Sequence, residues 1–238
     1  MKKTILTALA ALLVAVPAVK AQKVNKEALL AKIEKSDADI ANEKKAAKAA
    51  TWLARGKAFY EVAVEPTKSI FANMEPTMLK LAVGEPKSTT KETLNGTEYD
   101  AWVYPYFTAY VKDNKVVTWK QSKWVLKDAP KKAIEAYNKA YEIDPKSAAK
   151  AKGLKQVSDF CSQVGNVGID SGNYVEAADA YVTAFEAQSS PAYEKADPAL
   201  LYYAGYLLTV DGSNNPKSFA KGGEYLTKAI DLGYANEE

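Results

Sequence analysis

Histidine is absent from all 238 residues, and cysteine occurs once, at Cys161. Without histidine the chain has no serine–histidine–acid triad, no histidine-ligated metal site and no imidazole general base. A single cysteine excludes an internal disulfide. Cys161 falls on the apolar face of a helical pattern, which favours a small core residue over a reactive thiol. These absences exclude several classes of enzyme.

Other catalytic and ligand-binding motifs are missing as well. The sequence has no glycine-rich phosphate loop, no paired cysteines, no metal-spaced ligand set and no Gly-x-Ser-x-Gly elbow. A pair of carboxylates brought together by folding, as in glycosidases, stays open because two acids suffice there. No spacing singles out such a pair. We therefore expect a protein that is not an enzyme and has neither cofactor nor metal site.

The first 21 residues have the pattern of a cleaved signal peptide. Lys2 and Lys3 form a basic start, and an apolar run covers residues 4–16. Small residues at the spacing of a cleavage site precede Gln22. A membrane anchor is the alternative, but the run is too short to span a bilayer and no longer one follows. We expect an exported protein, periplasmic or extracellular, without an integral membrane segment after cleavage.

The excess of basic residues belongs to this leader. The whole chain has 32 basic and 29 acidic residues. Three of the lysines lie in residues 1–21, which contain no acidic residue, so the mature chain has 29 of each sign. A net charge of about zero gives no electrostatic reason to expect binding to nucleic acid or to an anionic membrane.

Small and aromatic residues recur at similar spacings in three parts of the chain. The positions are Trp52, Gly56, Phe59, Ala133, Tyr137, Ala140 and Pro145; then Cys161, Gly165, Gly168, Ala177, Tyr181 and Ala184; then Leu201, Ala204, Gly205, Leu208, Gly222, Leu226 and Ala229. This pattern resembles the tetratricopeptide repeat, a 34-residue pair of helices, with the first copy split by an insertion. A generic helical bundle is the alternative, and it predicts no such fixed frame.

The resemblance covers about half of the mature chain, and Arg55 and Gly168 depart from the family pattern. The chain is also similar to exported tetratricopeptide-repeat proteins of Bacteroidetes-type bacteria. The resemblance implies a mainly α fold of about three helical hairpins, which hold a protein or peptide partner. Upstream, an N-terminal helix over residues 25–35 is expected, with Ser36 or Asp37 capping a second helix that runs toward Trp52.

In this family the first helix of each hairpin lines a concave groove. Projected onto this sequence, the candidate partner-binding residues are Lys57, Tyr60, Glu61, Ser162, Asn166, Asp170, Tyr202 and Tyr206. A mixture of polar and aromatic side chains is typical of peptide-binding grooves. Alternatively, Tyr202 and Tyr206 pack on a neighbouring helix.

Residues 78–124 have a strand-like pattern that differs from both flanks. Asn95-Gly96 lies between runs that favour β-structure, which is the strongest short signal for a hairpin. Residues 112–115 form a second turn signal, and Pro105 indicates an edge or a bend. We predict an antiparallel β-meander of three or four strands inserted in the first repeat.

Aromatic residues are concentrated in this insertion. Strand alternation places Trp102, Tyr104, Tyr106 and Tyr110 on one face, if the register continues through Pro105. One hypothesis is an exposed platform that binds a glycan or a peptide. The alternative is that these rings pack a small sheet against the helices.

These observations divide the chain into four parts: the leader 1–21, the N-terminal helix and first repeat helix in 22–77, the meander 78–124, and the remaining helices 125–238. The last hairpin is expected to end near Gly233. Because a repeat array exposes apolar surface at an uncapped end, three explanations stay open. The chain self-associates through its C-terminal repeat, a partner covers this end, or the sequence belongs to a longer parent.

Overall fold

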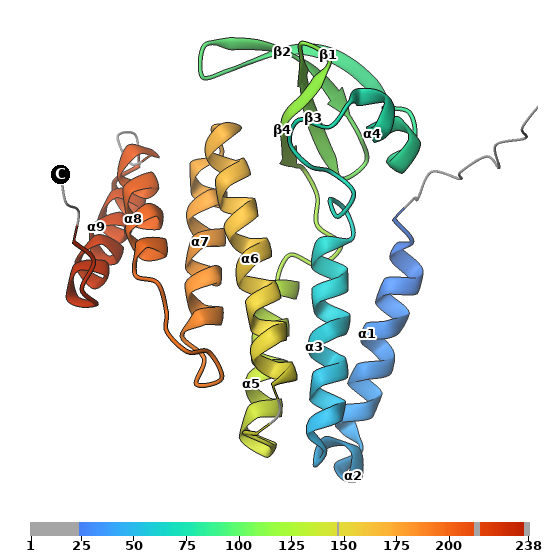
Figure 1. Ribbon diagram of the computed structural model, residues 1–238, viewed down its shortest axis with the longest axis vertical. Coiled ribbons are helices and arrows are strands. Elements are labelled where there is room, and N and C mark those ends of the chain that lie inside the picture. The colour runs from blue at the N-terminus through green and yellow to red at the C-terminus, as the bar shows by residue number, and fades with distance from the viewer. Residues whose placement is uncertain (1–23, 147, 212–214, 236–238) are drawn as a thin grey trace, which may run out of the picture.

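The computed structural model describes residues 24–146, 148–211 and 215–235, so the predicted leader lies outside the described residues. The described part is mainly helical, with one small antiparallel sheet (Figure 1), and this confirms the coarse fold class. Within those residues, no helix combines the length and the apolar character that crossing a membrane requires.

The described residues form nine α-helices. Their bounds are α1 Lys26–Ala41, α2 Glu43–Ala46, α3 Ala49–Val64, α4 Pro76–Val83, α5 Ala129–Ile143, α6 Ala149–Asp170, α7 Tyr174–Gln188, α8 Ala199–Asp211 and α9 Pro216–Asp231. In Figure 1 the long helices stand in a row from α1 at one edge to α9 at the other, and the sheet sits at one end of this row.

The long helices pack as successive pairs. α3 lies against α5 although residues 65–128 separate them, α6 lies against α7, and α8 lies against α9. α1 covers α3, and α7 also contacts α8, so that the pairs form one continuous helical array. Helices from both sides of the insertion therefore belong to the same packed pair.

A glycine on the first helix of each pair faces a large side chain on the second. A Cβ added to the glycine would lie 2.7 Å from the ring for Gly56 and Tyr137, 2.7 Å for Gly165 and Tyr181, and 2.8 Å from the side chain for Gly205 and Leu226. The missing Cβ lets each pair of helices approach closely, and the large side chain fills the space. The same contact thus holds all three pairs together.

The N-terminal helix is longer than the sequence predicts. α1 continues through Ser36 and Asp37 to its end at Ala41, so the predicted cap at these two residues is wrong. The Ser36 hydroxyl instead donates to the Ile33 oxygen at 2.8 Å, a bond that serine can form inside a helix. Arg55 donates to Ser36 Oγ at 2.7 Å and pairs with Asp37. These contacts attach α1 to α3.

The sheet follows the predicted meander closely. Its strands β1 Ser88–Leu94, β2 Thr97–Val103, β3 Phe107–Lys112 and β4 Lys115–Gln121 pair in chain order, each antiparallel to the next. In the two outer turns φ is 49° at Asn95, 80° at Gly96, 49° at Asp113 and 56° at Asn114. Positive φ at both central residues matches the twist of two-residue hairpins. The predicted turns are therefore confirmed.

The insertion also contains a helix that the sequence analysis misses. α4 includes residues 78–83, which were assigned to the meander. It starts with Pro76 in its first turn and ends before Gly84, which has φ 93°. An apolar run of this length suits a strand as well as a short helix, so periodicity does not separate the two.

Two hydrophobic cores share the molecule. The larger one joins the helical pairs and contains Cys161, which is buried as predicted. The smaller one lies between the sheet, α4 and the segment after α3, with Leu79, Phe107 and Trp119 among its members. Val167 of α6 packs against this second core, so the sheet rests on the helical array.

Buried phenols predict a loss of stability at alkaline pH. Burial raises the pKa of Tyr137 and of Tyr181 to about 12, above the ordinary 10.0. Because the raised value belongs to the folded state, this contribution to stability is complete below pH 10 and is lost as pH rises toward 12. We expect the free energy of unfolding, measured by denaturant titration, to fall across this range.

The variant Tyr137→Phe serves as the control for this titration, because it removes one ionising phenol and keeps the ring. Its unfolding free energy should fall less steeply with pH than that of the unsubstituted protein. Equal slopes for the two proteins would contradict the burial of this phenol.

Candidate functional site

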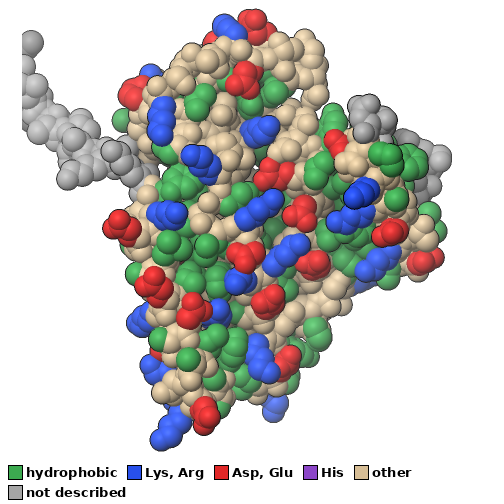
Figure 2. Space-filling model, turned by 180° about the vertical axis from the view of Figure 1, so that it is seen from behind, with side chains coloured by type: hydrophobic (Ala, Val, Ile, Leu, Met, Phe, Trp, Pro, Cys, Tyr) green, Lys and Arg blue, Asp and Glu red, His purple; other side chains and the backbone are tan. Residues whose placement is uncertain are grey.

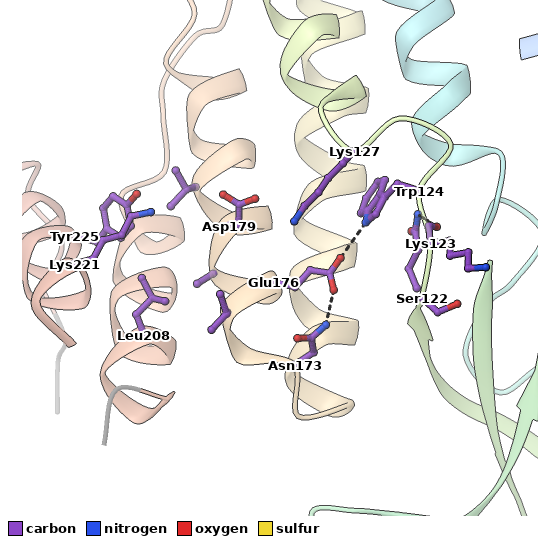
Figure 3. A pocket seen from close by; sticks show the side chains of 14 residues that line it. Ser122, Lys123, Trp124, Lys127, Asn173, Glu176, Asp179, Leu208, Lys221 and Tyr225 are labelled. Atoms are coloured by element: carbon purple, nitrogen blue, oxygen red, sulfur yellow. Dashed lines mark hydrogen bonds between the residues drawn. The ribbon is translucent and has the colours of Figure 1, made fainter. Parts of the chain in front are cut away.

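A cavity of about 700 Å³ lies between the segment that follows β4, helix α7 and the last helical pair (Figure 3). It is lined by Gln121, Ser122, Lys123, Trp124, Lys127, Asn173, Val175, Glu176, Ala178, Asp179, Val182, Leu208, Lys221 and Tyr225. Figure 2 shows a similar mixture over the helical part of the rear face, where acidic, basic and hydrophobic side chains alternate. A lining of this kind suits a polar ligand that carries apolar groups.

Glu176 is held in place at the cavity wall. Its Oε1 accepts a hydrogen bond from Trp124 Nε1 at 3.0 Å, and its Oε2 accepts one from the Asn173 side chain (Figure 3). The Trp124 ring is held in turn by an edge contact with Phe160, at 6.2 Å between centroids. Glu176 lies in the first turn of α7, where the helix dipole stabilises a negative charge. The carboxylate is thus oriented by groups from two distant segments.

Gln121, the last residue of β4, lies in the same wall. Its side chain is buried, and its Nε2 donates to the backbone oxygen of Lys123 at 3.2 Å. Its Oε1 is also buried and has no hydrogen-bond partner within the described part of the chain. Buried acceptors of this kind are rare in folded proteins, because an unmade hydrogen bond is costly.

Charges of both signs surround the opening. Asp179 pairs with Lys131 at 3.6 Å, and both side chains are about half exposed. Lys221 lies 5.5 Å from the centre of the Tyr225 ring. Lys127 is exposed and extends from the segment after β4 toward α7 (Figure 3). The rim can therefore meet acidic and basic groups of one ligand.

The predicted first-helix surface is only partly assembled on α3. Lys57 is exposed, whereas Glu61 forms an ion pair with Lys32 of α1. Tyr60 is half-buried and meets the Phe160 ring edge-on at 6.5 Å. Burial raises the pKa of its phenol. Tyr60 lines a separate depression of about 320 Å³ between α3 and α6.

The predicted residues of α6 do not join this depression. Asn166 accepts a hydrogen bond from the Tyr181 hydroxyl, and Ser162 is half-buried. The backbone oxygen of Asp170 accepts a bond from the side chain of Asn95 at 3.4 Å, and burial raises the pKa of its carboxyl. These residues mainly hold neighbouring elements together.

The two predicted tyrosines of α8 differ from each other. Tyr202 stacks on Tyr234 with 4.3 Å between ring centroids, so it packs as the alternative reading expected. Tyr206 is 52% exposed. Neither residue lines the cavity beside α7.

The predicted aromatic platform is wrong as a single exposed face. Tyr104 and Tyr110 are only 3% and 2% exposed, and Trp102 and Tyr106 are half-buried. Tyr104 stacks on Phe107 at 4.7 Å within the second core. The rings mainly pack the sheet, as the alternative reading expected.

The turn after β2 explains why simple alternation fails. Tyr104 and Phe107 close a two-residue turn, since the Tyr104 N–H donates to the Phe107 oxygen at 2.8 Å. Trp102 therefore lies opposite Ala109, and Ala101 lies opposite Tyr110. Directly opposed residues share a face, so Tyr110 lies on the other side of the sheet from Trp102.

The sequence analysis does not select the residues of the cavity wall. Asn173 and Glu176 have the spacing of a helix start, which indicates a cap and says nothing of a cavity. Gln121 carries no local signal at all, because only the packing of β4 beside α6 and α7 buries it. In addition, the described residues contain no group of three or more potential metal ligands.

Comparison with known proteins finds no matching family, no similar curated protein and no similar solved structure.

Proposed function

We propose that this chain is an exported, non-catalytic scaffold that binds a protein or peptide partner on three tetratricopeptide-like helical hairpins. The observation that carries the proposal is the contact repeated between the helices of each pair, from Gly56, Gly165 and Gly205. These glycines occupy one position of the repeat pattern, and their partners occupy another. A generic bundle has no reason to repeat one contact at one position.

Export is part of the proposal and rests on the leader pattern in residues 1–21. The intact mass of the protein isolated from its host tests this part directly. A mass that lacks these residues supports export, and a mass that retains them contradicts it.

The proposed partner surface is the cavity beside α7. It is the largest of the described cavities that combine apolar lining with charges of both signs. Helices α7 and α9 line it, each the second helix of its pair, whereas the family resemblance implied the first helices. Tyr60, Asn166 and Tyr202 support this shift, since they are engaged in contacts within the chain.

Capture of a partner by the immobilised protein tests the function. Envelope extract of the host would be the source, with mass spectrometry as the readout. A cavity variant, Val175→Asp with Asp179→Lys, changes two exposed side chains and should reduce capture by about tenfold or more. The control, Val117→Asp with Glu186→Lys, makes matched changes outside the cavity.

Two results of this capture would count against the proposal. If no specific protein is retained, the scaffold function fails. If the folded cavity variant retains the same protein at the same level, the partner binds elsewhere on the molecule.

A second candidate function is binding of a glycan near the aromatic insertion. A cavity of about 540 Å³ lies there, lined by Tyr104, Tyr106 and Phe107, with charged residues at its edge. The Tyr104 hydroxyl is buried and has no hydrogen-bond partner in the described structure. An array of polysaccharides tests this function, and the absence of any retention would remove it.

Self-association through α9 is a further expectation. Phe219 and Ile230 are 58% and 65% exposed, and they lie on the helix that ends the described array. Burial of two such side chains is favourable by about 1.5–3 kcal/mol each. Sedimentation equilibrium at rising concentration should show a dimer, which Phe219→Glu with Ile230→Lys should abolish.

The control for the dimer is Val117→Lys, an exposed apolar residue of β4 that lies away from α9. It should dimerise like the unsubstituted protein. A monomer at every accessible concentration would show that α9 is not a self-association surface.

A further inference from the structure

One wall of the cavity beside α7 carries an acceptor without a donor. The side chain of Gln121 has a relative exposure of 8%. Its Nε2 donates to the Lys123 backbone oxygen, which can only accept, so the orientation of the amide is fixed. The free atom is therefore Oε1, buried in a residue of the cavity lining and without a partner in the described residues. A ligand that supplies a donor would satisfy it.

Two carboxylates line the same cavity. Glu176 and Asp179 are three residues apart on α7, so they lie on one face of the helix (Figure 3). Glu176 is held by two neutral donors, and across the described ranges no lysine lies within ion-pair distance of it. Asp179 meets Lys131 at 3.6 Å in a solvent-exposed pair, which is weak and readily exchanged. Both carboxylates can therefore take a cation from outside.

This arrangement favours a planar cation with many donors. A guanidinium group offers five N–H donors in a fixed plane, whereas an ammonium group is a compact charge with three. Guanidinium also lies favourably against aromatic rings, and both Trp124 and Tyr225 line the cavity. An anion placed at the same wall would face two carboxylates and the carbonyl oxygen of Gln121.

The lysines of the rim do not conflict with this cation. Lys123, Lys127 and Lys221 are exposed, and all three line the cavity. Long exposed lysine side chains move freely and suit carboxylates that flank a basic residue in a peptide. The lining therefore matches a peptide segment of mixed charge, with its basic side chain at the acidic wall.

We propose that this wall binds an arginine side chain of the partner, with the guanidinium beside Gln121 Oε1, Glu176 and Asp179. The inference rests on the proposed function, since the partner supplies the side chain. The methylene groups of arginine would lie over the apolar part of the lining, where Val182 is buried.

Nitrogen-15 NMR of the Trp124 indole tests this assignment, because its N–H donates to Glu176. The probe is N-acetylarginine amide, and the neutral isostere N-acetylcitrulline amide is the control. We expect the arginine probe to shift this resonance with a Kd on the order of 1 mM, as befits a single side chain. The citrulline probe should leave it unchanged.

Two variants sharpen the test. Glu176→Gln should weaken binding of the arginine probe by about tenfold. Glu186→Gln removes an exposed carboxylate from the same helix outside the cavity and should bind like the unsubstituted protein. Equal shifts from both probes, or unchanged binding by the folded Glu176→Gln protein, would overturn the assignment.

The outcome is separable from that of the proposed function. If the immobilised protein captures a partner and the arginine probe does not bind, the scaffold stands and the arginine site falls. If the arginine probe binds as expected and no partner is captured, the wall binds guanidinium and the scaffold falls.

Discussion

Replacing Tyr137 with alanine is expected to lower the free energy of unfolding by about 3–5 kcal/mol. Tyr137 is 1% exposed, and its ring fills the space left by two glycines, Gly56 of α3 and Gly153 of α6. Removing the ring leaves a void where α3, α5 and α6 meet, because the glycines have no side chains to fill it. Denaturant titration followed by circular dichroism measures the loss.

Tyr206→Ala is the matched control, since it removes the same ring from a side chain that is 52% exposed. It should change the unfolding free energy by less than about 0.5 kcal/mol. A similar small change for Tyr137→Ala would mean that this ring does not hold the split pair together.

Adjacent glycines in α9 are expected to respond to alanine with opposite signs. A Cβ on Gly222 would lie 2.8 Å from the backbone oxygen of Gly205 and 3.0 Å from the backbone nitrogen of Thr209. Neither backbone atom can move aside, so α8 and α9 must separate, at a cost of about 1–3 kcal/mol. A Cβ on Gly223 would meet nothing within 4 Å. Alanine there should stabilise the helix by about 0.5–1 kcal/mol.

Thermal unfolding gives the sign of each change, and hydrogen exchange of the α8 and α9 amides shows where it acts. Gly222→Ala should accelerate exchange in both helices, and Gly223→Ala should not. Two variants that change stability in the same direction would contradict the close contact between these helices.

Local signals in the sequence account for the elements that were predicted well. Asn95-Gly96 predicts its hairpin because few residues other than glycine and asparagine adopt positive φ without strain. The split pair could be predicted because Gly56 and Tyr137 keep the spacing of a repeat across the insertion. In each case neighbouring residues, or a fixed frame, contain the information.

The predictions that failed depend on geometry between elements. Strand alternation does not pass through the tight turn at Pro105, so Tyr110 falls on the face opposite Trp102. The cavity could not be predicted because Trp124 and Glu176 meet only after the segment following β4 has packed beside α7. Nothing near either residue in the sequence indicates this meeting.

Site-specific photocrosslinking in the living host tests the central claim most directly, that a partner binds at the cavity beside α7. A photoreactive amino acid would replace Val175, which is 49% exposed and lines the cavity, or Lys57, which is exposed on the first-helix surface. The account predicts a crosslinked partner from position 175 and none from position 57. A partner that crosslinks from position 57 and not from position 175 would contradict it.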